Sequence, residues 1–110
     1  MKKSTNHRGK ILVPSDLVAY SHGSVVSKTL IDRKSGTLTL FAFDRGQGMS
    51  EHVAPYDAVV EILDGEALIT IAGRKLKAKS GDMVIMPADV PHALKAAEKF
   101  KMLLIMIRGK

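Results

Sequence analysis

The feature that most constrains the fold of this 110-residue chain is a pair of segments between residues 46 and 92 with regularly spaced glycine and histidine positions. The spaced positions are Gly46, His52 and Gly65 in the first segment, and Gly81, Pro87 and His92 in the second. Five residues separate Gly46 from His52, and five separate Gly81 from Pro87. Glycine tolerates the positive φ angles of tight turns. The spacing therefore predicts short strands bracketed by turns, with one histidine in each segment.

Apolar residues alternate with a two-residue period along most of the chain, and no segment has a convincing helical period. We expect around nine short strands. The clearest are residues 24–32, 37–43, 57–63, 66–72, 75–79, 83–86, 92–97 and 100–107. Residues 33–36 and the Asp64–Gly65 pair are predicted to form hairpin loops, because both central positions of an Asp–Gly turn tolerate positive φ. Further turns are expected at Gly73 and at residues 80–82. The pattern indicates an all-β sandwich or barrel.

The two segments resemble the paired motifs of the cupin superfamily, which read G-x5-H-x-H-x3,4-E-x6-G and G-x5-P-x-G-x2-H-x3-N. The resemblance covers roughly residues 37–107 and implies a small single-domain cupin of type 2, an RmlC-like jelly-roll barrel (a double-stranded β-helix). Ala54 and Ala58 occupy two of the four metal-ligand positions, and Asp89 and Ala96 replace a glycine and an asparagine of the second motif. The fold is implied, whereas the ligand set of the family is incomplete.

The candidate pocket follows from the alternation of side chains across strands. Side chains in phase with His52 and His92 are expected to face the interior of the barrel. The expected pocket residues are His52, Ala54, Ala58, Val60, His92, Leu94 and Met102. On the last strand, either Met102, Leu104 and Met106 or the alternate set Leu103, Ile105 and Ile107 would help to shape the pocket. The two imidazoles would then form the polar end of an otherwise apolar pocket.

In the cupin family, the motif histidines and glutamate hold a metal, which makes His52 and His92 tentative metal ligands. Imidazole suits zinc, iron and nickel, and carboxylates suit manganese, so one divalent metal (Zn, Fe, Mn or Ni) is the cofactor that the resemblance implies. Catalytic zinc generally has three protein ligands. A third could come from Glu51, Tyr56, Gln47, His22 or Asp57, of which Asp57 is the best carboxylate candidate. Without a metal, the pair could be hydrogen-bonded anchors or a proton donor and acceptor.

Three functions stay open on this basis. The leading expectation is a cupin that binds a small molecule, with His52 and His92 as polar anchors. The alternatives are a metal-dependent enzyme of dioxygenase or isomerase type, and a non-catalytic ligand sensor. Fold cannot decide among them, because one fold hosts many functions.

Composition restricts the partners. The net charge of +6 does not indicate nucleic-acid binding. Several basic residues lie in a tail over residues 1–10, which we expect to be flexible ahead of a barrel over residues 11–110, and the five aromatics are not interleaved with basic residues. No apolar run approaches the ~20 residues of a membrane span. The chain has no cysteine, and cytoplasm is the default expectation.

A second copy of the chain is the expected protein partner. Residues 58–63 and 102–107 are apolar on both strand faces, apart from Glu61. A two-sheet sandwich needs only one face of each sheet buried. The second apolar face therefore predicts a homodimer.

Overall fold

The computed structural model describes residues 7–108, and the predicted tail over residues 1–10 lies mostly outside this range. Its first element is a short 3-10 helix, and strands make up the rest. The elements are η1 (Pro14–Asp16), β1 (Val25–Arg33), β2 (Gly36–Phe43), β3 (Gly48–His52), β4 (Asp57–Ile71), β5 (Arg74–Lys79), β6 (Met83–Met86), β7 (His92–Lys95) and β8 (Phe100–Ile107). All pairings among these strands are antiparallel. The all-β jelly-roll prediction is confirmed. Within residues 7–108, no helix has the length and hydropathy needed to cross a bilayer.

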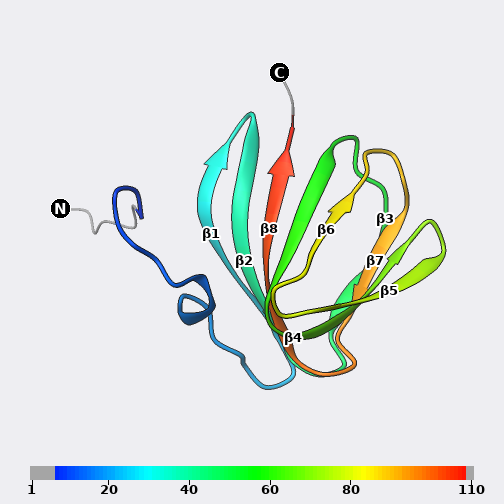
Figure 1. Cartoon of the computed structure of the whole chain (residues 1–110), viewed down its shortest axis with the longest axis horizontal. Helices are drawn as coiled ribbons and strands as arrows, with labels where there is room; N and C mark the ends of the chain where they lie inside the picture. The colour runs from blue at the N-terminus through cyan, green and yellow to red at the C-terminus, as the bar shows by residue number, and fades with distance from the viewer. Residues whose placement is uncertain (1–6, 109–110) are drawn as a thin grey trace.

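The strands form a strongly curled sheet with two halves that face each other (Figure 1). In the first half, which we call sheet A, β1 pairs with β2, β2 with β8, β8 with the start of β4, and β4 with β6. In the second half, sheet B, β3 pairs with β7, β7 with the end of β4, and β4 with β5. Strand β4 therefore connects the two halves, and the core lies between them.

The hairpin predicted at Asp64–Gly65 is wrong. Strand β4 continues through these residues, with Asp64 opposite Lys101 and Gly65 opposite Phe100 on β8, and a register shift after Ile62 marks a bulge. Gly65 has φ +75°, and a side chain at this position would collide with the backbone of Lys99. A glycine with positive φ can therefore serve a bend within a strand as well as a tight turn. The Asp–Gly pair thus bends one strand from sheet A into sheet B rather than reversing the chain.

The other predicted turns are confirmed. β1 and β2 form a hairpin in which Arg33 is opposite Gly36, and β4 and β5 form one in which Ile71 is opposite Arg74. Ala72 and Gly73 both have positive φ in the second hairpin, as a two-residue turn of the primed type requires. Strand β5 has its lysines exposed and Ala78 buried.

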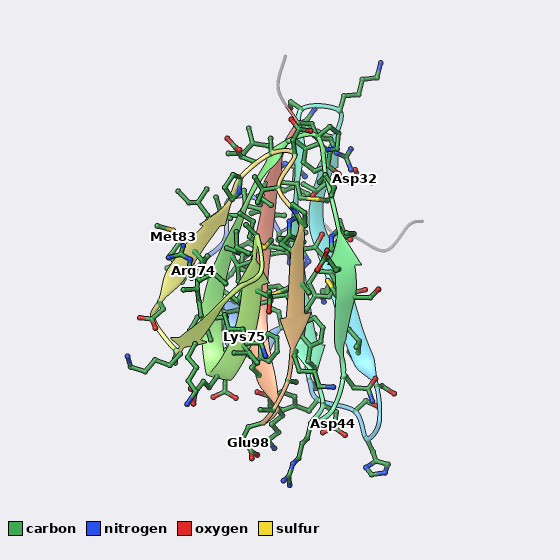
Figure 2. All side chains as sticks on the ribbon, turned by 90° about the vertical axis from the view of Figure 1, so that its right-hand side faces the viewer. Asp32, Asp44, Arg74, Lys75, Met83 and Glu98 are labelled. Atoms are coloured by element: carbon green, nitrogen blue, oxygen red, sulfur yellow. The ribbon has the colours of Figure 1, made fainter. Side chains whose placement is uncertain are left out.

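The interior of the barrel has two distinct ends. At one end, the Phe43 ring stacks on Phe100 with centroids 4.6 Å apart and on Phe41 with centroids 5.8 Å apart. We call this the phenylalanine end; in Figure 2, Asp44 and Glu98 mark its lower edge. The opposite end carries His52 and His92 and is called the histidine end.

The outer face of sheet A has its own small core. Val18, Leu40 and Ala42 are buried there, and Leu17 and Tyr20 of the N-terminal segment pack against them. The Tyr20 hydroxyl donates to Asp64 at 2.6 Å, and its burial together with this hydrogen bond raises the pKa of Tyr20. The segment before β1 is thereby fastened to the bend of β4.

Candidate functional site

His52 and His92 are direct cross-strand partners on β3 and β7. Their rings meet edge to face, with centroids 4.3 Å apart and an interplanar angle of 73°. The two Nε2 atoms are 3.1 Å apart, within hydrogen-bonding distance. His92 is only 3% exposed, whereas His52, the last residue of β3, is exposed at the rim. The two motif histidines therefore meet at one polar point at the end of the barrel.

Backbone carbonyls fix the orientation of both rings. Nδ1 of His52 lies 2.9 Å from the Ser50 carbonyl oxygen, and Nδ1 of His92 lies 3.1 Å from that of Val90. A carbonyl oxygen can only accept a hydrogen bond, so each Nδ1 must carry a proton and donate it. In both rings the acceptor is two residues earlier in the chain. The backbone segments that precede the two histidines thus direct both Nε2 atoms toward each other.

A cavity of about 180 Å³ borders the histidine pair. The residues that line it are His52, Val53, Ala54, Pro55, Tyr56, Ala58, Met86, His92, Leu94, Leu104 and Met106. The wall is apolar except for the two imidazoles and the Tyr56 hydroxyl. None of these lining residues is acidic, lysine or arginine. The cavity is therefore a small apolar space with a polar end.

The structure brings most of the expected pocket residues to this cavity but separates two of them. His52, His92, Ala54, Ala58 and Leu94 line it, although Ala54 lies in the loop after β3 rather than on the strand.

Val60 and Met102 do not line the cavity, and this part of the expected pocket is corrected. Both are fully buried in the main core. Strand alternation places them on the interior face, but it does not give their depth along the barrel. The alternate set on β8 does not line the cavity either, because Leu104 and Met106 face it instead.

Sequence reasoning missed Met86, Val53 and Pro55 as lining residues. Met86 is opposite Ala58 across the β4–β6 pairing, so it follows from a register that the sequence alone did not specify. Val53 and Pro55 belong to the irregular segment between β3 and β4, where alternation gives no orientation.

Two hydrogen bonds hold the rim of the cavity, one between backbone groups and one from a backbone N–H to a side-chain carboxylate. The Asp89 N–H donates to the Ala54 carbonyl at 2.7 Å, and the Ala88 N–H donates to Asp57 Oδ1 at 2.8 Å. Asp89 has φ 63°, in the left-handed region that favours the glycine of the cupin motif. These contacts join the loop before β7 to the loop before β4. They also engage the Asp57 carboxylate at the rim.

The donor set does not fit the metal that the cupin resemblance implies. Among residues 7–108, no group of three or more histidine and acidic side chains is placed to hold a metal ion. Asp57 is not grouped with the two imidazoles, and His22 lies 3.9 Å from Asp44 in an exposed ion pair. Catalytic zinc sites usually have three protein ligands. Two imidazoles leave such a site incomplete.

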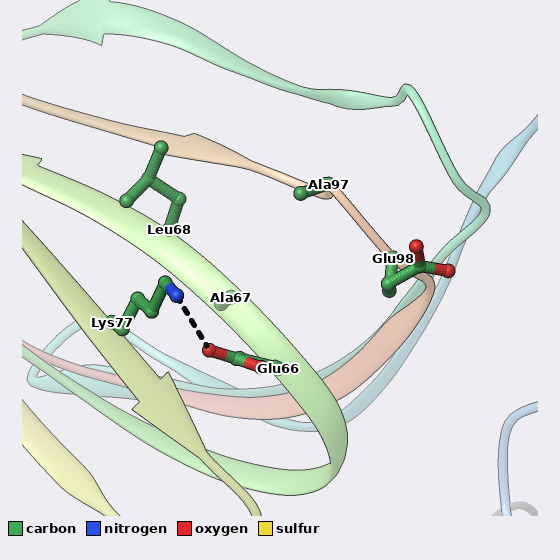
Figure 3. Close-up of a pocket in the computed structure, with 6 residues that line it drawn as sticks. All are labelled: Glu66, Ala67, Leu68, Lys77, Ala97 and Glu98. Carbon is green, nitrogen blue, oxygen red and sulfur yellow. Dashed lines mark ion pairs between the residues drawn. The ribbon is translucent and has the colours of Figure 1, made fainter.

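A larger hollow, of about 260 Å³, lies outside the barrel beside β4 and β5 (Figure 3). Its walls include Leu68, Ala97 and Glu98, and an ion pair of 3.9 Å joins Glu66 to Lys77 across it. Both partners of the pair are substantially exposed, and surface ion pairs of this kind contribute little. The hollow has no buried polar group that would orient a ligand, so the smaller cavity is the better candidate.

The chain matches the family model of the cupin domain over residues 39–108. A conserved protein of unknown function from Streptococcus pyogenes is 36% identical, with a TM-score of 0.91 and coverage of 97% of this chain and 94% of that one.

Two further solved structures are similar. A cupin superfamily protein from Desulfitobacterium hafniense is 28% identical, with a TM-score of 0.88 and coverage of 99% of this chain and 100% of that one. A cupin 2 conserved barrel domain protein from Leptotrichia buccalis is 38% identical, with a TM-score of 0.82, and the match covers 84% of this chain but 45% of that one. Among curated proteins, none matches significantly. With a family match over most of its length and a close structural relative, this chain belongs to the cupin family.

Proposed function

We propose that this cupin binds a small organic molecule in the cavity at the histidine end, with His52 and His92 as its polar anchors. The observation that carries the proposal is the pair of facing Nε2 atoms at the end of an apolar cavity. Ligand sites are typically apolar concavities with a few placed polar groups. The cavity, at about 180 Å³, suits a compound of roughly benzene size with one short polar substituent, since apolar cavities of about 150 Å³ hold benzene.

Filling the cavity tests this proposal. Ala58 lines the cavity and is 3% exposed, so Ala58→Leu adds three carbons to the space that the ligand would occupy. We expect toluene, as an apolar probe observed by NMR, to bind the unmodified protein and to lose at least tenfold in affinity to the variant. The free energy of unfolding of Ala58→Leu should differ from that of the unmodified protein by less than about 1.5 kcal/mol, because the added carbons enter open space. Equal toluene binding by both proteins would contradict the proposal.

The proposal assigns no metal, because among residues 7–108 no third ligand is grouped with the two imidazoles. A metal-dependent dioxygenase or isomerase would need that ligand from residues such as Asp57, whose carboxylate accepts the Ala88 N–H. Binding without turnover would be the role of a ligand sensor, and product formation would indicate an enzyme.

We also propose that a second copy of the chain covers the part of the outer face of sheet A that the N-terminal segment leaves open. The pairings of β6, β4, β8, β2 and β1 support this, because they align one cross-strand row of aliphatic residues: Ile85, Val59, Ile105, Leu38 and Ile31. Ile85 is 59% exposed in the single chain. Such a continuous row would leave apolar surface in water unless a partner covered it.

The dimer is tested with a charge in this row. Ile85→Glu should convert a dimer into a monomer of 11.9 kDa by light scattering, because an unpaired carboxylate is costly to bury. Val13→Glu is the matched control, since Val13 is 56% exposed and lies outside the row. A monomer for the unmodified protein at micromolar concentration, or a dimer for Ile85→Glu, would contradict the proposal.

A further inference from the structure

Two methionines flank Ala58 in the wall of the cavity. Ala58 on β4 is directly opposite Met86 on β6, and it is also directly opposite Met106 on β8. Residues that pair across antiparallel strands have their side chains on the same face of the sheet, and all three line the cavity. Met86 is only 3% exposed, and Met106 is half-buried. This part of the wall therefore consists of two thioether side chains with a small alanine between them.

The spacing of these three residues follows from the geometry of the sheet. Opposite Cα atoms in antiparallel sheets are alternately about 4.5 and 5.5 Å apart, and a residue with neighbours on both sides has one distance of each kind. The Cα atoms of Met86 and Met106 are therefore about 10 Å apart, with Ala58 between them. A methionine sulfur contacts an aromatic ring favourably at about 5 Å, and the flexible side chain can adjust to reach that distance. A ring above the Ala58 methyl group can thus have one sulfur at this distance on each side.

We propose that Met86 and Met106 select an aromatic ring as the body of the ligand, and that the ring lies between their two sulfurs. The inference rests on the proposed binding function and deepens it, because the size of the cavity alone would admit a saturated ring as well as an aromatic one. A sulfur–aromatic contact is favourable in itself, and this cavity offers two of them to one ring. A saturated ring of the same outline would gain only dispersion contacts from the same side chains.

The rest of the cavity suits a ring in this place. Leu94 and Leu104 offer further apolar contacts, and no acidic, lysine or arginine side chain is among the lining residues. Position 58 is the glutamate position of the cupin motif, and a side chain of that length would fill the space between the two methionines. Ala58 leaves this space open. His52 and His92 border the same cavity, so they remain available to a polar substituent on the ring.

Toluene and methylcyclohexane, which carry neither charge nor hydrogen-bonding groups, provide the test. After each affinity is corrected for the partition of the probe between water and hexane, we expect toluene to bind at least fivefold more tightly than methylcyclohexane. The double variant Met86→Leu/Met106→Leu should lower this ratio at least threefold, because leucine replaces methionine at nearly constant volume but has no sulfur. Met49→Leu is the matched control, since Met49 packs against the core but does not line the cavity. It should leave the ratio unchanged.

The possible outcomes distinguish the inference from the proposed function. Equal binding of both hydrocarbons, or a ratio that the double variant leaves unchanged, would overturn the inference but leave the proposed function. If neither hydrocarbon bound, both would be overturned. NMR of the toluene complex tests the geometry on the unmodified protein, and so also serves if the double variant does not fold. The ring protons should show nuclear Overhauser effects to the ε-methyl groups of both Met86 and Met106, and effects to only one of them would contradict a ring between the two sulfurs.

Discussion

The two ends of the barrel interior are filled in opposite ways. At the phenylalanine end, β2 and β8 contribute Phe43 and Phe100, whose rings stack and are fully buried. At the histidine end, β4 contributes Ala58 and β8 contributes Met106, and a cavity remains between the walls. Large planar side chains fill one end of the barrel, and small side chains leave the other hollow. This suggests that stability is concentrated at one end and binding at the other.

The difference extends to the way in which each end is held. Packing holds the phenylalanine end, where Gly65 allows β4 to pass close to the Lys99 backbone. Hydrogen bonds hold the histidine end, where the loops before β4 and β7 are joined by the Asp89–Ala54 and Ala88–Asp57 contacts. Backbone N–H groups donate both bonds, so the rim can keep its shape while the side chains that line the cavity change. That property suits a site whose ligand positions have diverged from those of the family.

The largest effect is expected at the packed end. Phe100→Ala should lower the free energy of unfolding by about 3–5 kcal/mol, because it leaves a void next to the Phe43 ring. Leu104→Ala is the matched change at the histidine end, and we expect a loss near the lower limit of about 2 kcal/mol for such truncations, because Leu104 already borders open space. Urea denaturation measures both values.

Phe100→Leu, which keeps part of the packing, provides a measurable value if Phe100→Ala does not fold. It should still lose more stability than Leu104→Met, the corresponding mild change at the cavity. Equal losses at the two ends would contradict the division of the barrel into a packed end and a binding end.

Chain reversals could be predicted from the sequence where the residues of the turn alone determine them. The loop predicted at residues 33–36 and the turn predicted at Gly73 are confirmed, since the strands on either side of each pair with each other. Asp64–Gly65 gave the same signal, but a glycine with positive φ can serve a bend within a strand as well as a turn. Only the pairing of β8 with β4 across the bend distinguishes them, and that pairing is a long-range property.

The site was accessible to sequence reasoning in part. The spacing of the motifs and the cupin resemblance identified His52 and His92 as facing residues, because each occupies a ligand position of its own segment. Alternation identified which residues share the interior face, yet it placed Val60 and Met102 at the cavity although both lie in the core. The carbonyls that orient the rings belong to Ser50 and Val90. Those contacts depend on backbone path, which no side-chain pattern records.

The smallest effect is expected at the rim. Asp89 has a positive φ, and glycine would relieve that strain while it increases the freedom of the unfolded chain. These effects oppose each other, so Asp89→Gly should change the free energy of unfolding by less than about 0.5 kcal/mol in thermal denaturation. Asp89→Val should cost about 1–2 kcal/mol, because a β-branched residue is poorly accommodated at positive φ.

The two Asp89 variants together determine what holds the rim. The Asp89 N–H, which donates to Ala54, is present in all three proteins, so a near-silent Asp89→Gly with a costly Asp89→Val would assign the effect to backbone conformation. A loss above about 2 kcal/mol for Asp89→Gly would instead mean that the aspartate side chain stabilises the rim. The histidine end would then depend on side-chain interactions as the phenylalanine end does, and the contrast between the two ends would be reduced to the presence of the cavity.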